Sequence, residues 1–274
     1  MPTILSLSSQ VARGHVGHSA GQFVWQRLGM DVIALPTIIL SNRPDCEACA
    51  GERLSPEFLE QMIAALATNG WLGGIDAVFT GYLPSREHVA LAARLIGRLK
   101  GENPSILYCC DPILGDEPGG LYVAEDTANA LRDMLLPLAD LVTPNRFELG
   151  WLTGRQIRTR LDAIEAAKAL GAMVLATSSP GETADVLVNL LVDRDRQWQA
   201  VVHARDGVPH GTGDFLAALF LANLLRRRSP SEALAHAIGG IETVIAASNG
   251  RDELNIIGSQ DDWASAQPWP VIPA

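Results

Sequence analysis

Strand-like and helix-like segments alternate along most of this chain, and this alternation limits the fold more than any other feature of the sequence. Short apolar segments are typical of buried strands, and they occur at residues 3–7, 32–35, 77–80, 106–110, 173–176 and 186–192. Segments with helical periodicity lie between them, at about residues 19–28, 57–66, 87–99, 127–136 and 161–170. Strand followed by helix, repeated in this way, predicts an α/β fold with a mostly parallel sheet covered on both faces.

The C-terminal part of the chain has a different character. Residues 212–227 and 231–247 are each predicted to form a long helix, and a short Arg-Ser-Pro turn separates them. The first of these helices is apolar almost all round, which is typical of a helix buried against a sheet. The prolines near Trp269 indicate an extended strap at the end of the chain. Because no repeat or linker is visible, we expect residues 1–274 to form a single domain.

The charge balance points to small ligands. The chain has 31 acidic and 21 basic side chains and a formal net charge of −10, which argues against nucleic acid or an anionic membrane as a partner. Only two of the bases are lysines, Lys100 and Lys168, so an anionic ligand must rely on arginine, backbone amides or a metal ion. The sequence lacks a signal peptide and a membrane-spanning apolar run, so we expect a cytoplasmic protein.

Two of the four cysteines, Cys46 and Cys49, have the C-x-x-C spacing that can bind metal or form a disulfide. A zinc site needs further ligands, and the sequence has no second pair or histidine partner at a suitable spacing. The better interpretation is a loop that carries two small polar residues.

The strongest local motif is Gly211-Thr212-Gly213-Asp214, at the start of the apolar helix. Glycines allow backbone amides to approach a ligand closely, and amides at a helix N-terminus favour negative charge. An aspartate at this place would repel a phosphate, but it can accept the proton of an attacking hydroxyl while the amides stabilise a transferring phosphoryl group. The alternative is a helix cap, because threonine and aspartate are both frequent in the first turn.

A second motif, Thr143-Pro144-Asn145-Arg146-Phe147-Glu148, follows a predicted strand at residues 140–142. Asn145 and Glu148 lie one helical turn apart on one face, where an amide and a carboxylate can hold a hydrated Mg²⁺. The same spacing fits a capping box at a helix start. Both interpretations can hold together.

Two further segments follow predicted strands. Asp111 ends a strand, and carboxyl ends of strands border the crevice in which open α/β sheets bind ligands. Residues 117–122, Glu-Pro-Gly-Gly-Leu-Tyr, are flexible enough to close over a site, although they are also ordinary turn residues. The polar loop at residues 8–19 either binds a polar ligand through Ser9 or only connects a strand to a helix, and His15 can equally be a structural histidine.

These four segments, in this order and with these separations, resemble the pyridoxal kinases of the ribokinase-like superfamily. The matching pieces are Ser9 with residues 14–20, Gly81-Tyr82-Leu83, residues 111–116, residues 143–149 and Gly211-Thr212-Gly213-Asp214. With the helices that follow, they cover nearly the whole chain. The resemblance implies a ribokinase-like three-layer sandwich, with a mostly parallel central sheet between two layers of helices.

The resemblance also implies an activity and a set of site residues. The activity is phosphorylation of the 5′-hydroxymethyl group of pyridoxal, pyridoxine or pyridoxamine by MgATP, in vitamin B6 salvage. Asp214 matches the catalytic base, and Gly211, Thr212 and Gly213 match the anion hole. The residues implied for the vitamer are Ser9, His15, Val16, Ser41, Arg43, Asp45 and Tyr82. The residues implied for the nucleotide are Asp111, Asp116, Tyr122, Thr143, Asn145, Glu148, Thr177 and Arg205, of which Asp111, Asn145 and Glu148 lie on the metal side. A homodimer and an activating monovalent cation such as K⁺ are further expectations.

The sequence departs from the family's pattern at three places. Members often carry a Ser-Asn-His-Thr stretch over the vitamin ring, whereas this chain has Ser-Asn-Arg-Pro-Asp-Cys at residues 41–46, which leaves the preferred vitamer open. Some relatives have a lysine where this chain has residues 176–179, Ala-Thr-Ser-Ser, so Thr177 would contact the nucleotide without a cation. The phosphates would then depend on Arg205 and Mg²⁺. The segment 203–209 is also shorter than in some relatives, so its contacts to the adenine stay open.

Three alternatives remain. A hydroxymethylpyrimidine kinase resembles this layout, but in that branch the motif usually ends in Gly-Thr-Gly-Cys, and residue 214 here is Asp. Sugar or nucleoside kinases usually begin with a longer glycine-rich segment than the one after Ser9. A non-catalytic vitamer-binding protein would be expected to lose the base or the metal-side residues, and none is lost.

Overall fold

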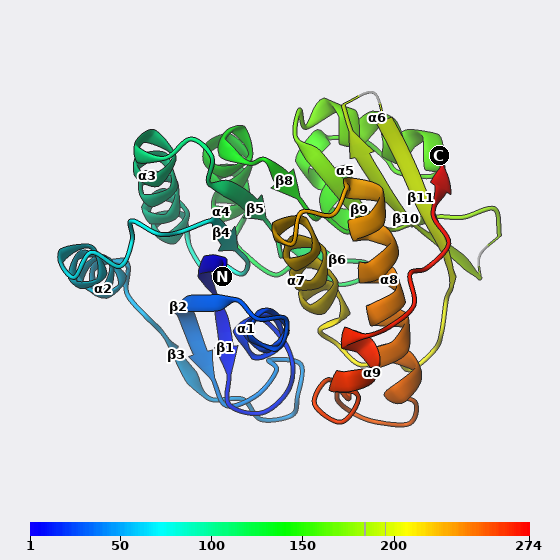
Figure 1. Cartoon of the computed structure of the whole chain (residues 1–274), viewed down its shortest axis with the longest axis horizontal. Coiled ribbons are helices and arrows are strands. Elements are labelled where there is room, and N and C mark those ends of the chain that lie inside the picture. The colour runs from blue at the N-terminus through cyan, green and yellow to red at the C-terminus, as the bar shows by residue number, and fades with distance from the viewer. Residues whose placement is uncertain (184, 195) are drawn as a thin grey trace.

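A ten-stranded sheet runs through the middle of the molecule (Figure 1). The computed structural model describes residues 1–183, 185–194 and 196–274. In spatial order the strands are β12 (Ile272–Pro273), β11 (Arg196–His203), β10 (Val186–Asp193), β9 (Met173–Pro180), β8 (Leu141–Val142), β5 (Leu107–Cys110), β4 (Ala77–Thr80), β1 (Thr3–Val11), β2 (Asp31–Leu40) and β3 (Gly51–Arg53). The six strands from β9 to β2 are parallel to one another, and the edge strands are antiparallel.

Helices cover both faces of the sheet, as the alternation of segments predicts. On one face, α1 (His18–Arg27), α7 (Thr212–Leu225), α8 (Pro230–Ala247) and α9 (Gln260–Ala264) share a hydrophobic core. The other face carries α2 (Pro56–Thr68), α3 (Arg86–Glu102), α4 (Glu125–Ala130), α5 (Arg146–Thr153) and α6 (Arg160–Ala169), which form two further clusters. None of the described helices is long and apolar enough to cross a membrane.

The helix α7 has little amphipathic character, and its position explains why. Every residue from Phe215 to Asn223 is buried, because α7 packs against α1 on one side and α8 on the other (Figure 1). Trp25 of α1 donates a hydrogen bond from its indole to the carbonyl oxygen of Ala218, at 3.1 Å. A helix buried on all sides is apolar all round. Its first turn, which carries Asp214, is therefore held in a fixed place.

The strand order reverses at β1. The strand β2 pairs with β1 on one side, and β4, which comes later in the chain, pairs with β1 on the other side. The carboxyl ends of β1 and β4 thus flank a topological switch point, where open α/β sheets bind their ligands. The backbone after β4 lies against the side chain of Ser8 there, since a β-carbon on Gly81 would lie 2.3 Å from the Ser8 hydroxyl oxygen.

Several elements differ from the sequence predictions. The strand β11 was not predicted, because its polar and apolar residues alternate in a mixed way that lacks a continuous apolar run. The predicted helix at residues 127–136 is a short α-helix followed by a π-helical turn, Leu131–Leu135. The stretch after Asp111 is not a loop but a small hairpin, formed by β6 (Gly115–Asp116) and β7 (Gly120–Leu121). The C-terminal strap is extended and adds β12 to the sheet edge.

Candidate active site

The candidate site lies at the carboxyl edge of the parallel strands. Four loops meet there: residues 12–17 after β1, residues 41–50 between β2 and β3, residues 204–211 before α7, and the turn after β5 that begins at Asp111. We call residues 41–50 the flap and Gly211-Thr212-Gly213 the glycine turn. Several of the residues predicted from the sequence lie on these loops, and the others lie on the strands and helices beside them.

The glycine turn is fixed by a close approach between two backbones. Gly211 is the N-cap of α7 and has a φ of 97°, a left-handed conformation that suits glycine. A β-carbon at this position would lie 1.9 Å from the carbonyl oxygen of His15 and 3.4 Å from the side chain of Val16. The loop after β1, which carries His15 and Val16, two of the predicted vitamer residues, therefore rests directly on the predicted anion hole.

Ser9 is tied to the same loop. A β-carbon on Gly17, whose φ is 54°, would lie 2.3 Å from the Ser9 hydroxyl oxygen. The backbone of Gly17 also hydrogen-bonds to the carboxylate of Asp214. Ser9, Gly17 and Asp214 thus form one contact series from β1 to α7.

Burial gives Asp214 the proton affinity of a general base. Loss of solvation raises the pKa of its carboxyl from 3.8 to about 6, and hydrogen bonding by the backbone of Gly17 opposes part of this rise. The carboxylate is in the first turn of α7, directly after the glycine turn. It can accept a proton near neutral pH, while the backbone amides beside it attract an anion.

Asp111 is a second buried carboxyl at this edge, and its side chain is only 6% exposed. Burial, and then the charges of Glu148 and Asp214, raise its pKa well above 3.8. Thr143 donates a hydrogen bond to it at 2.8 Å, which partly opposes the shift. The described groups that shift its pKa by charge are all acids. A cluster of this kind is suited to a divalent cation, which would neutralise the repulsion.

Asn145 and Glu148 form the capping box that their spacing allows. The amide oxygen of Asn145 accepts a bond from the Glu148 backbone, and the Glu148 carboxylate accepts one from the Asn145 backbone, both at 2.9 Å. Glu148 also accepts a bond from the Leu114 backbone at 2.8 Å, and Asn145 donates to the carbonyl of Gly115 at 2.8 Å. Burial raises the pKa of Glu148 to about 7, although these amides oppose it.

The capping box therefore joins α5 to the hairpin of β6 and β7, residues 115–121, which we call the hairpin lid. Within the described residues, no group of three His, Cys, Asp or Glu side chains is placed to hold a metal ion alone. The oxygens of Asp111, Asn145 and Glu148 suit a Mg²⁺ ion that brings phosphate and water ligands with it.

The hairpin lid carries Asp116 and leads into Tyr122. The Tyr122 side chain is half exposed, and burial together with Asp116 raises the pKa of its phenol. An ion pair between Arg146, the first residue of α5, and Glu117 fastens the tip of the hairpin. The stretch is thus an ordered hairpin beside the capping box.

The flap carries three predicted vitamer residues, which differ in their surroundings. The hydroxyl of Ser41 is exposed and closes its own loop, because it donates to Asn42 at 2.6 Å and accepts from the Ala50 backbone at 3.0 Å. Arg43 and Asp45 instead reach other loops of the site. Cys46 and Cys49 are free and exposed, which agrees with the prediction of a polar loop.

The other predicted residues lie around this centre. The Tyr82 backbone amide contacts the Ser8 hydroxyl at 3.3 Å, and its carbonyl accepts from Thr37 at 2.7 Å. Thr177 pairs with Asn145 through an isolated β-bridge. Arg205 forms an ion pair with Glu242 of α8 at 2.6 Å, so its charge is already partly neutralised. To make the predicted contact with a phosphate, Arg205 would have to leave Glu242 or contact both groups at once.

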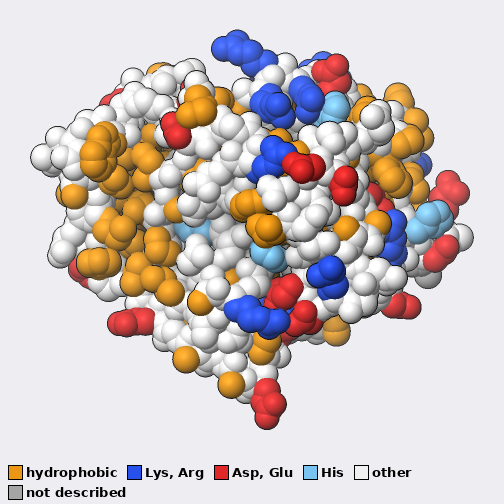
Figure 2. All heavy atoms as spheres, turned by 60° about the horizontal axis from the view of Figure 1, so that its bottom comes forward, with side chains coloured by type: hydrophobic (Ala, Val, Ile, Leu, Met, Phe, Trp, Pro, Cys, Tyr) orange, Lys and Arg blue, Asp and Glu red, His pale blue; other side chains and the backbone are white. Residues whose placement is uncertain are grey.

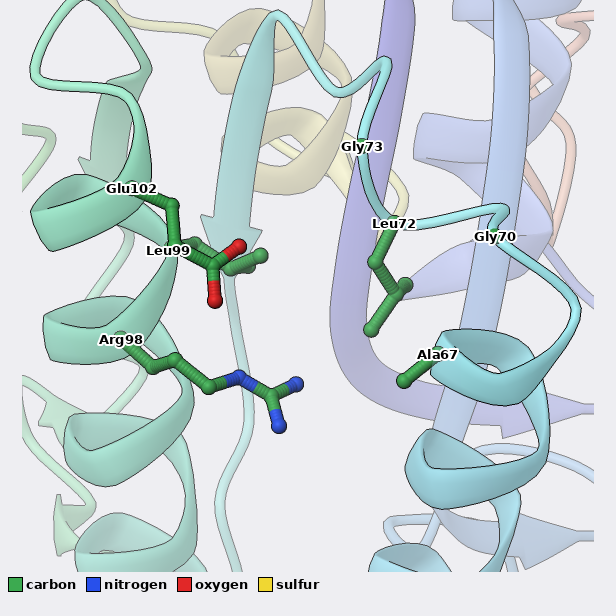
Figure 3. A pocket seen from close by; sticks show the side chains of 7 residues that line it. All are labelled: Ala67, Gly70, Leu72, Gly73, Arg98, Leu99 and Glu102. Carbon is green, nitrogen blue, oxygen red and sulfur yellow. The ribbon is translucent and has the colours of Figure 1, made fainter.

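A cavity of about 310 Å³ lies elsewhere, between the C-terminal ends of α2 and α3 (Figure 3). Arg98 and Glu102 point into it from α3, and Leu72 and Ala67 line the other side. These helix ends lead into the amino ends of β4 and β5. The cavity is therefore at the opposite edge of the sheet from the candidate site.

Comparisons with known proteins agree with this fold and identify the family. The family model described as phosphomethylpyrimidine kinase matches residues 26–256. A pyridoxal kinase PdxY of Leifsonia xyli is 35% identical over 270 residues, covering 96% of this chain and 95% of the relative. A pyridoxal kinase PdxY of Deinococcus radiodurans is 33% identical and covers 95% and 92%. The solved pyridoxal kinase of Leishmania donovani in complex with ADP has a TM-score of 0.93 at 28% identity, covering 99% of both chains.

The fold and the site therefore define a small-molecule kinase of the ribokinase-like superfamily. Within that class, the chain belongs to the phosphomethylpyrimidine kinase family and to its pyridoxal kinase relatives. The family and the fold implied by the sequence motifs are thus confirmed.

Sequence reasoning missed two residues at this edge. Glu253, in the loop after α8, lies against Gly14, where a β-carbon would be 3.0 Å from its carboxylate oxygens. His210, just before the glycine turn, lies 3.5 Å from the carboxylate of Asp45. Neither has a local signal, since both contacts join segments far apart in the chain.

Proposed function

We propose that this protein transfers the γ-phosphoryl group of ATP to the 5′-hydroxymethyl group of pyridoxal, which forms pyridoxal 5′-phosphate and ADP in vitamin B6 salvage. Pyridoxine and pyridoxamine are proposed as further acceptors, each of which forms its own 5′-phosphate. The observation that carries this proposal is the position of Asp214, directly after the glycine turn, with a pKa raised to about 6. A base is most effective when its pKa is near the working pH. The names of the relatives, one of them bound to ADP and pyridoxamine, support the acceptor.

In this proposal, Asp214 accepts the proton of the acceptor hydroxyl as the oxygen of that hydroxyl attacks the γ-phosphorus. The backbone amides of the glycine turn and the N-terminal end of α7 stabilise the charge on the transferring group. Ser9, His15, Val16 and Tyr82 line the acceptor side. The hairpin lid excludes water, so that the hydroxyl is phosphorylated in preference to water.

ATP is proposed to bind with Mg²⁺ on the side of Asp111, Thr143, Asn145 and Glu148. Mg²⁺ there supplies positive charge that neutralises the phosphates and the acidic cluster. Burial and the charges of Glu148 and Asp214 raise the pKa of Asp111, and burial and the charge of Asp116 raise the pKa of Glu148, which supports this placement. Thr177 and Arg205 are proposed nucleotide contacts, and Asp116 and Tyr122 border the phosphates from the hairpin lid.

The test is a panel of acceptors with saturating MgATP. ADP formation is measured with pyridoxal, pyridoxine, pyridoxamine and hydroxymethylpyrimidine, and the phosphorylated product is identified by mass spectrometry. We expect turnover of the B6 vitamers, and the panel also ranks them. Turnover of the pyrimidine alone would overturn the proposal in favour of the second candidate.

That second candidate is a hydroxymethylpyrimidine kinase. The description of the matching family model favours it. Both acceptors are hydroxymethyl groups on a heteroaromatic ring, so the same base can serve both. The aspartate at residue 214 and the names of the relatives favour the vitamer.

We further propose that residues 1–274 act as one kinase domain and that two copies form a homodimer. Hydrophobic side chains gather on the left of Figure 2, on the side where α2 and β2 lie in Figure 1. Exposed residues of these elements include Ile39 and Phe58, and a patch of this kind suits a second copy. Light scattering after size exclusion tests this, with Phe58→Asp expected to favour the monomer.

Two smaller proposals complete the function. The protein is proposed to act in the cytoplasm, where ATP is available. A monovalent cation such as K⁺ is proposed to activate it, and the replacement of KCl by tetramethylammonium chloride at constant ionic strength tests this. A rate that does not depend on K⁺ would exclude such a cation.

A further inference from the structure

Arg43 is the point at which the flap is fastened to the rest of the site. Its side chain is only 14% exposed. The guanidinium donates to the carboxylate of Asp45 at 3.2 Å and to the backbone carbonyl of Asp252 at 3.1 Å, and it lies 3.7 Å from the carboxylate of Glu253. One side chain thus joins the flap to the loop after α8.

The carboxylate of Glu253 is a largely buried partner for the guanidinium of Arg43. Its side chain is 17% exposed, and the oxygen that faces Arg43, Oε2, is buried without a hydrogen-bond partner among the described residues. The carboxylate also packs on the α-carbon of Gly14, in the loop whose next residue supports the glycine turn. A buried carboxylate needs a compensating charge, and the guanidinium of Arg43 places a positive charge 3.7 Å from this one.

Asp45 extends the connection to the catalytic turn. Its second carboxylate oxygen lies 3.5 Å from Nε2 of His210, and His210 directly precedes Gly211. The series of contacts therefore runs from Glu253 through Arg43 and Asp45 to the residue beside the anion hole.

We infer that Arg43, held by Glu253, is a positioning residue for phosphoryl transfer: it fixes the flap over the acceptor and, through Asp45 and His210, fixes the glycine turn beside Asp214. This inference rests on the proposed function. Small errors in the placement of an acceptor reduce the rate strongly, so the contact series affects acceptor use more than ATP binding.

The experiment compares the wild type with Arg43→Gln, Glu253→Gln and the double variant. KM and kcat are measured separately for ATP and for the best acceptor of the panel. We expect the KM for the acceptor to rise about tenfold in each single variant, with kcat lowered, while the KM for ATP stays within about twofold. The double variant should lose no more kcat/KM for the acceptor than the more impaired of the two single variants, because each single substitution already removes the same interaction. Arg43→Lys should recover part of the loss.

Arg13→Gln is the matched control. Arg13 pairs with Asp252 at 2.8 Å and joins the same loops, but both side chains are largely exposed, at 68% and 72%. Exposed pairs of this kind contribute little, so its kinetics should match the wild type. Additive effects in the double variant, equal changes in the KM for ATP, or the same loss in Arg13→Gln would overturn the inference.

Amide hydrogen exchange separates this inference from the proposed function, because it needs no activity. The flap is closed by the bond from the Ser41 amide to the Ala50 carbonyl, at 2.7 Å. In Arg43→Gln and Glu253→Gln, exchange across residues 41–50 should accelerate at least about tenfold, with α3 unchanged. Unchanged exchange in the flap would overturn the inference whatever the acceptor panel gives. A panel without turnover would overturn only the proposed function.

Discussion

The carbonyl oxygen of His15 lies so close to the α-carbon of Gly211 that a β-carbon at residue 211 would be 1.9 Å from it. The loop after β1 and the turn before α7 are therefore pressed together, backbone against backbone. The positive φ of Gly211 adds a second reason for glycine at this position.

Gly211→Ala should therefore lower activity much more than it lowers stability. Separation of the two backbones displaces the glycine turn, and a displacement of about 1 Å can cost about 100-fold in rate. The strain should cost about 1–3 kcal/mol in the free energy of unfolding. Steady-state kinetics and urea unfolding measure the two effects.

Gly97→Ala is the control for this change. Gly97 lies in α3, where a β-carbon would meet nothing within 4 Å. Alanine there should stabilise the protein by up to about 1 kcal/mol through helix propensity, with unchanged kinetics. Equal kinetics for the two alanine variants would contradict the proposed role of the close approach.

Asp214→Asn should reduce kcat by about 10²–10⁴-fold, because an amide cannot accept the hydroxyl proton. Binding of pyridoxal and ATP, measured by calorimetry, should change little. In the wild type, kcat/KM should fall as the pH drops below about 6, since the carboxyl is then protonated. If the variant kept near wild-type turnover, the assignment of the base would be wrong.

The same substitution should stabilise the protein at alkaline pH. Burial raises the pKa of Asp214 in the folded state from 3.8 to about 6. Between these values the folded state binds more protons than the unfolded state, so the contribution of this group to stability is complete below about pH 4 and is lost by about pH 6. The melting temperature of Asp214→Asn should therefore exceed that of the wild type at pH 8. The difference should shrink toward pH 4, and a constant difference would exclude this linkage.

Much of the fold and of the site could be predicted from the sequence, because the signals are local. Apolar runs mark the main strands β1, β2, β4, β5, β8, β9 and β10, and α7 is apolar all round because it is buried between α1 and α8. The capping box of Asn145 and Glu148 follows from spacing alone. The motifs also lie at the ends of strands, which brings them to one edge of the sheet.

The rest could not be predicted, because it depends on contacts between distant segments. Arg43 contacts Glu253 only because α8 runs across the face of the sheet, so that the loop after α8 lies beside the flap. The pairing of Arg205 with Glu242 also has no signal in either segment. β11 was missed for a related reason, since only pairing with β10 and β12 makes its mixed sequence a strand.

Glu148→Gln should weaken the use of Mg²⁺ while the helix α5 remains formed. The glutamine keeps an acceptor for one backbone amide, but it removes the buried negative charge. Loss of a group that supports a metal site typically costs about 10- to 100-fold in metal affinity, so the Mg²⁺ concentration for half-maximal activity should rise by that factor. Initial rates over a Mg²⁺ titration at fixed ATP measure this.

The matched control for Glu148 is Glu232→Gln. Glu232 forms the same kind of capping box, with Ser229 at the start of α8, but it is exposed. This variant should lose up to about 1 kcal/mol of stability and keep the wild-type dependence on Mg²⁺. A shifted Mg²⁺ dependence in both variants would show that capping, and not the charge, controls the metal.

The ion pair between Arg146 and Glu117 fastens the hairpin lid, so Arg146→Gln should loosen it. The pair is exposed, at 39% and 54%, and such pairs contribute about 0.2–1 kcal/mol. The KM for ATP should therefore rise by no more than about fivefold. Hydrolysis of ATP without an acceptor should increase, because water enters more easily. Arg94→Gln, which removes the exposed pair with Glu60 on α2 and α3, should change neither quantity. If acceptor-free hydrolysis stayed at the wild-type rate in Arg146→Gln, the hairpin would not be the element that excludes water.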